Sequence, residues 1–168
     1  MKLIPLIFLL ACAHASAQTS DFNLNDGRIR FSVPQSWGAI MEKSDGNPQA
    51  IAFAVADPAT AGTDDAARVT VKTRQLKAPS EYADAMQNEM LLSKAQTGYA
   101  AEVESKESGT HNYTVTRGAT TYSIKDQFKL IGNIAVKVRC ERPVLKATSK
   151  AWSADFERDC AAVSASIR

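Results

Sequence analysis

Apolar and polar residues alternate with a period of two in several short stretches of the chain, and this pattern predicts strands with one buried face. In residues 28–33 the apolar side chains of Ile29, Phe31 and Val33 share a face, and Pro34 follows them. Proline has no N–H to donate to a neighbouring strand, so it ends this one. The other predicted strands, which include one continuous apolar run, cover residues 39–43, 50–56, 68–76, 99–104, 113–117, 121–130 and 133–142.

Near the C-terminus, the spacing of apolar residues changes to a helical period. The segment 151–167 carries one apolar stripe, and Thr148 or Ser149 can cap its N-terminus. The stripe consists of Trp152, Phe156, Cys160, Val163 and Ile167. We therefore predict a terminal helix that packs one face on the sheet.

An earlier helix is predicted to begin at 79–81, where Ser80 can serve as the N-cap and Glu81 places a negative charge in the first turn. Gly98 ends this helix. Its apolar face consists of Tyr82, Met86, Met90 and Ser93. The order strands, helix, strands, helix predicts an α+β fold, in which a mostly antiparallel sheet carries a central and a C-terminal helix.

The first 17 residues have the pattern of a cleaved export signal. Lys2 supplies the positive start, residues 3–11 are apolar, and Ala-Ser-Ala at 15–17 is a small-x-small cleavage site. The apolar run is about half of the ~20 residues that a membrane-spanning helix needs. We therefore expect cleavage before Gln18, a periplasmic location, and a single α+β domain over 18–168.

A second cleavage pattern overlaps the first. Residues 9–12, Leu-Leu-Ala-Cys, are similar to a bacterial lipobox, in which Cys12 becomes the lipidated first residue. Leu10 departs from the small residue that such boxes favour at its position. On this alternative the protein is anchored to a membrane through Cys12, and only then does it have a membrane partner.

Composition and charge are those of an ordinary globular protein. The chain has 168 residues, of which 45% are hydrophobic and 23% are charged. Its net charge is +2, and removal of Lys2 with the signal lowers it to about +1. Nucleic-acid binding calls for a basic patch and, for single strands, interleaved aromatics. We therefore expect no nucleic-acid partner.

The cysteines agree with export. Cys12 belongs to the signal, which leaves Cys140 and Cys160, an even count in an oxidising compartment. Cys140 falls on the apolar face of the strand 133–142, and Cys160 falls on the apolar stripe of the terminal helix. A helix packed on that sheet would bring the two sulfurs together, so a disulfide is predicted. The alternative is a pair of buried free thiols.

No residue pattern predicts catalysis or metal binding. Nucleophilic catalysis usually needs a histidine base, and His14 leaves with the signal. His111 remains, in a polar segment at 107–112 that is typical of a solvent-exposed hairpin loop. One histidine and two cysteines are too few for a zinc site, and turn chemistry explains Asp-Gly-Asn at 45–47 without calcium. We therefore predict a non-enzymatic protein without a cofactor.

The two tryptophans have different surroundings in the sequence. Trp152 lies on the stripe of the terminal helix, so it is assigned to the core. Trp37 follows a strand end, where it either packs in the core, which we favour, or lines the rim of a binding site.

The segment Phe31-Ser-Val-Pro-Gln-Ser-Trp37 is followed by an apolar strand, a central helix, a meander of strands and a terminal helix. This arrangement resembles the Mog1/PsbP-like α/β/α sandwich superfamily over most of residues 18–168. The resemblance is one of topology, with Val-Pro-x-x-Trp as its only motif. It implies a binding or accessory protein rather than an enzyme. Some small exported proteins of this shape look like immunity proteins, which neutralise toxins delivered into the periplasm.

Two functional hypotheses follow. The first is a periplasmic protein-binding module, such as an immunity protein whose partner is a secreted hydrolase toxin, with contacts in the polar loops 57–66 and 104–112. The predicted contact residues are Asp64, Asp65, Ser108 and His111. The second is an envelope accessory protein or lipoprotein-like domain that binds a membrane complex or a small apolar ligand. An enzyme working through carboxylates alone would need two close acids in a cleft, and no pattern predicts them.

Overall fold

The computed structural model describes residues 18–63, 65–102 and 109–168, and the predicted signal and lipobox lie outside them. The strands are β1 (Thr19–Leu24), β2 (Ile29–Pro34), β3 (Gly38–Lys43), β4 (Gln49–Val55), β5 (Ala67–Gln75), β6 (Ala100–Ala101), β7 (Thr110–Arg117), β8 (Thr120–Ile131) and β9 (Ile134–Pro143). The helices are α1 (Tyr82–Lys94) and α2 (Lys150–Ser166), with short 3₁₀ turns at Pro58–Thr60 and Pro79–Glu81.

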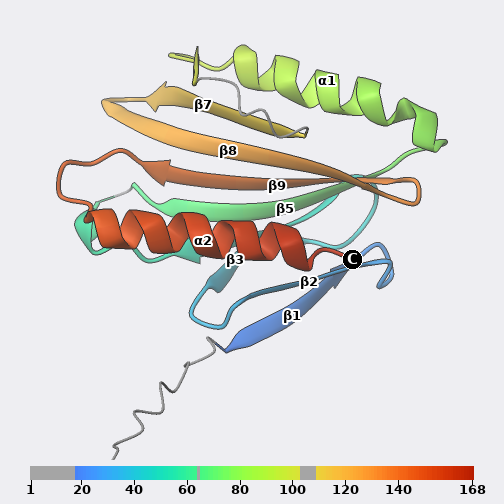
Figure 1. The fold of residues 1–168 in the computed structure, drawn as a ribbon, viewed down its shortest axis with the longest axis horizontal. Coiled ribbons are helices and arrows are strands. Elements are labelled where there is room, and N and C mark those ends of the chain that lie inside the picture. The colour runs from blue at the N-terminus through green and yellow to red at the C-terminus, as the bar shows by residue number, and fades with distance from the viewer. Residues whose placement is uncertain (1–17, 64, 103–108) are drawn as a thin grey trace, which may run out of the picture.

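A seven-stranded sheet with the order β3-β4-β5-β9-β8-β7-β6 forms the centre of the molecule, and β1 and β2 form a separate hairpin. Neighbouring strands run antiparallel. Figure 1 shows α2 running alongside β5 and the β1–β2 hairpin, whereas α1 lies at the other side of the sheet, near β7 and β8. The predicted α+β fold with a mostly antiparallel sheet and two packed helices is confirmed.

The main core lies between α2, the β1–β2 hairpin and one face of β4, β5 and β9. Residues directly opposite each other in an antiparallel pair point to the same side of the sheet. Val71 pairs with Val138 and Val69 with Cys140, so their side chains all face α2. The buried apolar residues that meet these from α2 and the hairpin include Phe31, Phe156, Cys160, Val163 and Ile167.

The second, smaller core lies on the opposite face of the sheet, under α1. It is built from the β7 and β8 residues Tyr113, Val115, Tyr122 and Ile124. Helix α1 buries only Ala85 and Ser93 within its length. The helix lies over β8 and β9 and reaches the Lys72–Arg74 end of β5, where Glu89 binds Lys72.

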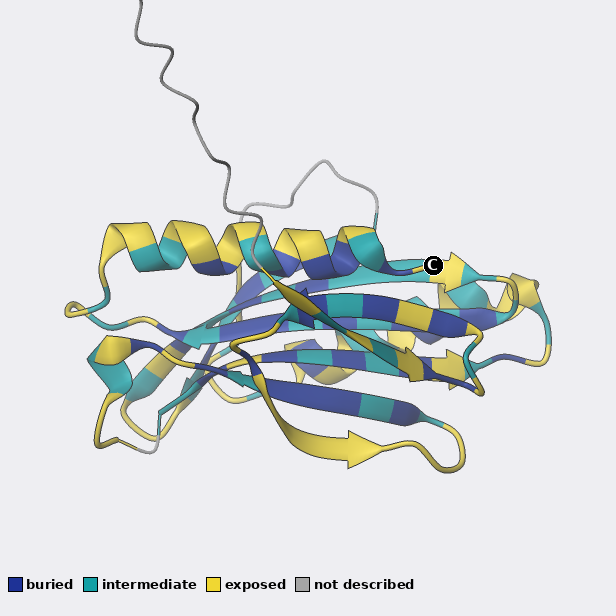
Figure 2. Ribbon diagram, turned by 90° about the horizontal axis from the view of Figure 1, so that it is seen from below, coloured by how far each residue is buried: buried dark blue, intermediate teal, exposed yellow. Residues whose placement is uncertain are grey.

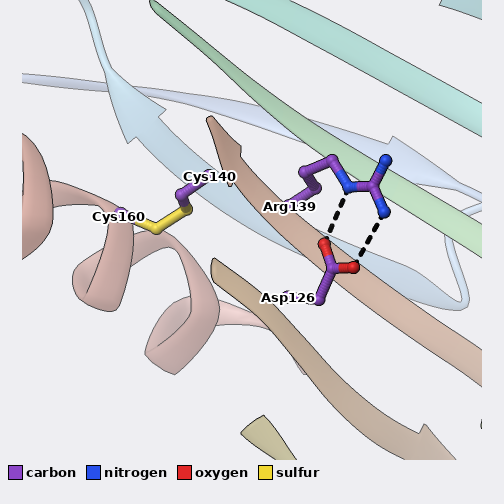
Figure 3. Close-up of a disulfide and its surroundings, with 4 residues drawn as sticks. All are labelled: Asp126, Arg139, Cys140 and Cys160. Atoms are coloured by element: carbon purple, nitrogen blue, oxygen red, sulfur yellow. Dashed lines mark hydrogen bonds and ion pairs between the residues drawn. A yellow bond between two sulfur atoms is a disulfide. The ribbon is translucent and has the colours of Figure 1, made fainter. Parts of the chain in front are cut away.

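Helix α2 has the predicted apolar stripe and the predicted cap. The Ser149 hydroxyl accepts a hydrogen bond from the Trp152 amide N–H at 3.1 Å, which satisfies one of the free amides of the first turn. Cys140 and Cys160 form a disulfide, with their Cα atoms 6.3 Å apart. Figure 3 shows this bond joining β9 to α2. The predicted pairing is confirmed.

Three local predictions differ from the structure. The strand β1 was not predicted, because Phe22 and Leu24 are its only large apolar residues. Ser80 does not cap α1: a 3₁₀ turn occupies its position, and no side chain caps the helix. The helix also ends at Lys94, ahead of Gly98, which lies in a later turn with a φ of +66°.

Candidate protein-binding surface

A row of cationic side chains crosses the face of the sheet that α1 only partly covers. Arg68, Thr70, Lys72 and Arg74 alternate along β5 and point away from the α2 core. Their partners across β9 are Glu141, Arg139, Lys137 and Ala135, in that order. Period-two alternation thus gives β5 and β9 one apolar face and one charged face.

Part of this charged face forms a shallow concavity of about 450 Å³. We call it the basic groove, and it is lined by Arg68, Thr70, Lys72, Arg117, Lys137, Arg139 and Glu141. All of the lining residues come from β5, β7 and β9, and none comes from a helix. Five of the lining residues are cationic and one is a carboxylate. Three carboxylates, Asp126, Glu89 and Glu141, form ion pairs with four of these cations.

Asp126 is the deepest of these carboxylates. Its side chain is 0% exposed, and Arg139 donates to its two oxygens from Nε and Nη2, both at 2.8 Å. Tyr113 donates a third hydrogen bond, at 3.2 Å. Burial lowers the pKa of Arg139, but hydrogen bonding and charge attraction from Asp126 outweigh burial and raise it. Figure 3 shows Arg139 pointing away from the disulfide, on the other side of β9.

A second carboxylate, Glu89 of α1, holds two lysines. Lys72 and Lys137 lie directly opposite each other on β5 and β9, where like charges repel. Glu89 accepts a hydrogen bond from Lys72 at 2.6 Å and another from Lys137. Burial acts to raise the pKa of Glu89, but these two lysines outweigh it and lower the pKa to about 2. Burial also lowers the pKa of Lys137.

The third carboxylate, Glu141, binds Arg117 of β7 through both oxygens, one of them at 2.9 Å from Nη2. Donation of hydrogen bonds to Glu141 raises the pKa of Arg117. Within the described part of the chain, neither Arg68 nor Arg74 forms an ion pair, and both are exposed. No described carboxylate therefore holds either guanidinium within ion-pair distance.

An exposed sheet edge lies two strands away from the basic groove. All six residues of β3 are exposed, and Figure 2 shows this strand beside the largely buried β4. The pairing of β3 with β4 shifts by one residue between Ala39 and Met41. Ile40 is 53% exposed and Met41 is 44% exposed. This edge offers both backbone groups and apolar side chains to a partner.

The predicted contact residues are not all on this surface. Asp64 and Ser108 lie outside the described residues. Asp65 is half-buried and accepts hydrogen bonds from Tyr122 at 2.6 Å and Thr120 at 3.0 Å. Its carboxylate thus ties the loop after β4 to the start of β8, and a role in partner binding remains a prediction.

His111 is not in an exposed loop, so that prediction was wrong. The residue belongs to β7, and only 8% of its surface is exposed. Its ring stacks on Tyr113 at 4.7 Å between centroids, and its Nε2 lies 3.0 Å from the Tyr99 hydroxyl. Every second residue of β7, starting with His111, points into the small core. The start of the strand was missed because its first inward residue is a histidine between polar neighbours rather than an apolar residue.

As predicted, both tryptophans pack in the core region: Trp37 is part of the main cluster, and Trp152 is partly buried against it. Trp37 is 8% exposed and packs in the main cluster. Trp152 stacks on Phe156 at 5.3 Å, and its indole N–H donates to the Ala56 carbonyl at 2.8 Å. Neither ring therefore lines a binding rim.

In the described ranges, no group of three or more histidine, cysteine, aspartate or glutamate side chains is arranged to hold a metal ion. Neither α1 nor α2 is long and apolar enough to cross a bilayer.

Comparison with known proteins gives similarity in structure but not in sequence. No family model matches the chain, and no curated protein sequence matches it either. The Saccharomyces cerevisiae Ran-binding protein Mog1p superposes with a TM-score of 0.54 and 11% identity, over 91% of this chain and 96% of Mog1p. The chain has the Mog1/PsbP-like fold. The resemblance inferred from the sequence is thereby confirmed.

Another protein of similar structure is described as involved in cell envelope biogenesis. LpqN of Mycobacterium tuberculosis superposes with a TM-score of 0.52 and 12% identity, over 89% of both chains. A protein from Bacteroides thetaiotaomicron matches 88% of this chain with 16% identity and a TM-score of 0.48, and the chain spans 47% of that protein's length. The likeness to Mog1p and LpqN shows a shared fold, and a shared fold does not fix a function.

Proposed function

We propose that the protein is a non-enzymatic protein-binding module of the bacterial envelope. The observation that carries this proposal is the uncovered sheet edge β3, where Ile40 and Met41 are exposed. An exposed edge strand has unpaired backbone N–H and C=O groups with which another chain can pair. Large exposed apolar side chains beside it favour a protein partner over a small ligand.

The ionisable groups near this surface support a binding role rather than catalysis. Asp126, Glu141 and Glu89 each pair with cations of the sheet, so all three carboxylates are already engaged in ion pairs. A general acid or base needs a proton that it can exchange near neutral pH. A Glu89 pKa of about 2 keeps that carboxylate ionised instead.

The proteins that share the fold also support binding. Mog1p is described as Ran-binding, and LpqN is described as involved in cell envelope biogenesis. The export signal predicted at residues 1–17 directs this chain to the periplasm, where a disulfide is stable. We propose that its partner there is a secreted hydrolase toxin, so that the protein acts as an immunity protein.

An envelope accessory role is the second candidate. It is favoured if Cys12 is lipidated, because a lipid anchor would hold the domain at a membrane. In that case the edge β3 would bind a resident membrane complex rather than a toxin.

The test is affinity capture from periplasmic extract with the purified protein as bait, followed by mass spectrometry. The immunity proposal expects one secreted hydrolase in stoichiometric amount and loss of that enzyme's activity in the complex. Recovery of resident envelope proteins instead would support the accessory role. If no protein is retained at near-stoichiometric level, the protein-binding proposal is rejected.

A matched pair of variants assigns the capture to the edge. Ile40→Lys with Met41→Lys places two charges on β3, and we expect capture to fall at least tenfold. Leu91→Lys with Leu92→Lys makes the same change on α1, where these leucines are 54% and 66% exposed. Capture by this second variant should remain within twofold of the unmodified protein.

A further inference from the structure

We propose that the basic groove and Arg74 bind an extended, acidic segment of the partner protein. This inference rests on the proposed protein-binding function and names the chemistry of the bound segment. Five cations line the groove, and the three carboxylates that contact them, Glu89, Asp126 and Glu141, leave an excess of positive charge. Arg68 and Arg74 contribute charge that no described carboxylate neutralises.

Four of the five groove cations, all except Arg68, are held by carboxylates before any ligand arrives. Both Asp126 oxygens fix the guanidinium of Arg139, and both Glu141 oxygens fix that of Arg117. Glu89 holds Lys137, whose side chain is only 11% exposed. Binding therefore orders fewer long side chains than a flexible basic surface would require, and this saves entropy.

The spacing of the cations matches an extended chain. Arg68, Lys72 and Arg74 project from β5 on one side, at intervals of two and four residues. Side chains two residues apart in a strand are separated by roughly 6.6 Å, and an extended peptide has the same repeat. Acidic residues at alternate positions of a bound segment would thus face successive cations of β5.

The neighbouring strand leaves space for that segment. On the same face, the β4 residues opposite Arg68, Thr70 and Lys72 are Ala54, Ala52 and Ala50. Their methyl groups do not shield the cation row from the side of β3. A chain lying over β4 can therefore reach the β5 cations with its acidic side chains and Met41 with an apolar one.

Other ligands fit this surface less well. None of the groove residues is aromatic, so nucleic-acid bases have no surface on which to stack. Small-molecule sites bury most of their ligand among apolar side chains, and here the lining is polar and open. Opposite charge also steers a partner to its site and raises the association rate.

The experiment measures the affinity of the purified protein for a fluorescent peptide of four Glu-Val repeats, by anisotropy at low salt. A peptide of four Gln-Val repeats is the neutral control, and we expect the acidic peptide to bind at least tenfold more tightly. Raising the salt from about 20 to about 200 mM shortens the Debye length roughly threefold, so we expect this binding to weaken severalfold. Vesicles of anionic lipid, assayed in parallel, test a membrane surface as the alternative ligand.

Two double charge reversals that change the net charge equally, one in the candidate site and one outside it, locate the site. Arg68→Glu with Arg74→Glu should abolish the preference for the acidic peptide. The neutral variant Arg68→Gln with Arg74→Gln should reduce the preference without adding repulsion. Lys146→Glu with Lys150→Glu, at exposed positions at and before the start of α2, should leave the affinity within twofold. Thermal unfolding of each variant checks that the fold is retained.

Several outcomes overturn the inference. Equal affinity for the two peptides does so, as does equal loss in the control variant or binding of anionic vesicles without binding of the acidic peptide. The capture experiment separates this inference from the proposed function. If Arg68→Glu with Arg74→Glu still captures the partner, the acidic-segment inference fails and the binding function stands; if no partner is captured, the function fails.

Discussion

At the scale of single residues, the most buried charge in the described structure is Asp126, which carries none of its surface to solvent. Its two oxygens are saturated by Arg139 and by the Tyr113 hydroxyl. A buried pair of this kind contributes little over an apolar pair of the same volume, but removal of one partner leaves the other charge unpaired. The arginine of the basic groove therefore depends on this carboxylate.

The first prediction concerns this pair. Asp126→Ala should lower the free energy of unfolding by about 3–5 kcal/mol, because Arg139 then loses its buried partner. Urea unfolding is the measurement. The double variant Asp126→Leu with Arg139→Met should be more stable than Asp126→Ala alone. Asp45→Ala, at an exposed turn, should change stability by less than about 0.5 kcal/mol. A double variant no more stable than the single one would contradict this account.

The second prediction concerns pH. The folded-state pKa of Glu89 is about 2, below the ordinary glutamate value of 4.5. A carboxyl with a lowered pKa stabilises the fold above its unfolded pKa, and this contribution is lost as pH falls through the folded pKa. Stability should therefore decline from about pH 4.5 towards pH 2, and Glu89→Gln should flatten that decline. Glu42→Gln, on exposed β3, is the control and should leave the profile of urea midpoints against pH unchanged.

At the scale of elements, α2 was predictable and α1 was predictable only in outline. The α2 stripe is long, and five of its residues face the core at helical spacing, so its start, cap and disulfide partner followed from the sequence. Helix α1 buries only Ala85 and Ser93. The predicted face residues Tyr82, Met86, Met90 and Ser93 are half-buried or buried, so the face was predicted correctly. Apolar periodicity did not indicate the ion pairs of Glu89 with Lys72 and Lys137.

Only the β9 half of the basic groove was predictable from the sequence. The alternation in β9 already placed Lys137, Arg139 and Glu141 on one face, away from Cys140. The neighbour of β9 across the sheet is β5, which lies more than fifty residues earlier in the chain. No local pattern reports that pairing, so the two cationic rows could not be joined without the structure.

The third prediction concerns the bond between β9 and α2. Cys140 and Cys160 are 20 residues apart in sequence. Closing a loop of that length restricts the unfolded chain, and on this entropy argument the disulfide stabilises the fold by about 3 kcal/mol. Unfolding in urea with a thiol reductant should show a loss of this size. A Cys140→Ala with Cys160→Ala variant should be insensitive to the reductant, and equal stability of the native protein with and without reductant would contradict the prediction.

At the scale of the whole molecule, the order of layers was predictable, while the division of the sheet into two cores was not. The sequence predicts that each strand has an apolar face, but not that β4, β5 and β9 turn theirs to α2 while β7 and β8 turn theirs to α1. This division leaves a charged face on β5 that α1 covers only in part. The candidate surface is thus a consequence of topology rather than of any motif.

The fourth prediction concerns the length of the exported protein. We expect an intact mass that corresponds to a chain beginning at Gln18, because small residues occupy 15–17. Ala17→Asp should block this cleavage, and Cys12→Ala should leave it unchanged. A mass showing a lipidated N-terminal Cys12, lost in Cys12→Ala, would establish the membrane-anchored form instead.

The two rows of β9 also bear on how reliably the chain finds its fold. Ile134, Val136, Val138 and Cys140 alternate with Lys137, Arg139 and Glu141 along this strand. A slip of one residue in pairing would exchange the rows and move the charges under α2. Such a slip would leave charged side chains buried without partners, and it would also turn Cys140 away from Cys160. The alternation in β9 therefore specifies its pairing register, because a slipped register costs both the buried apolar contacts and the disulfide.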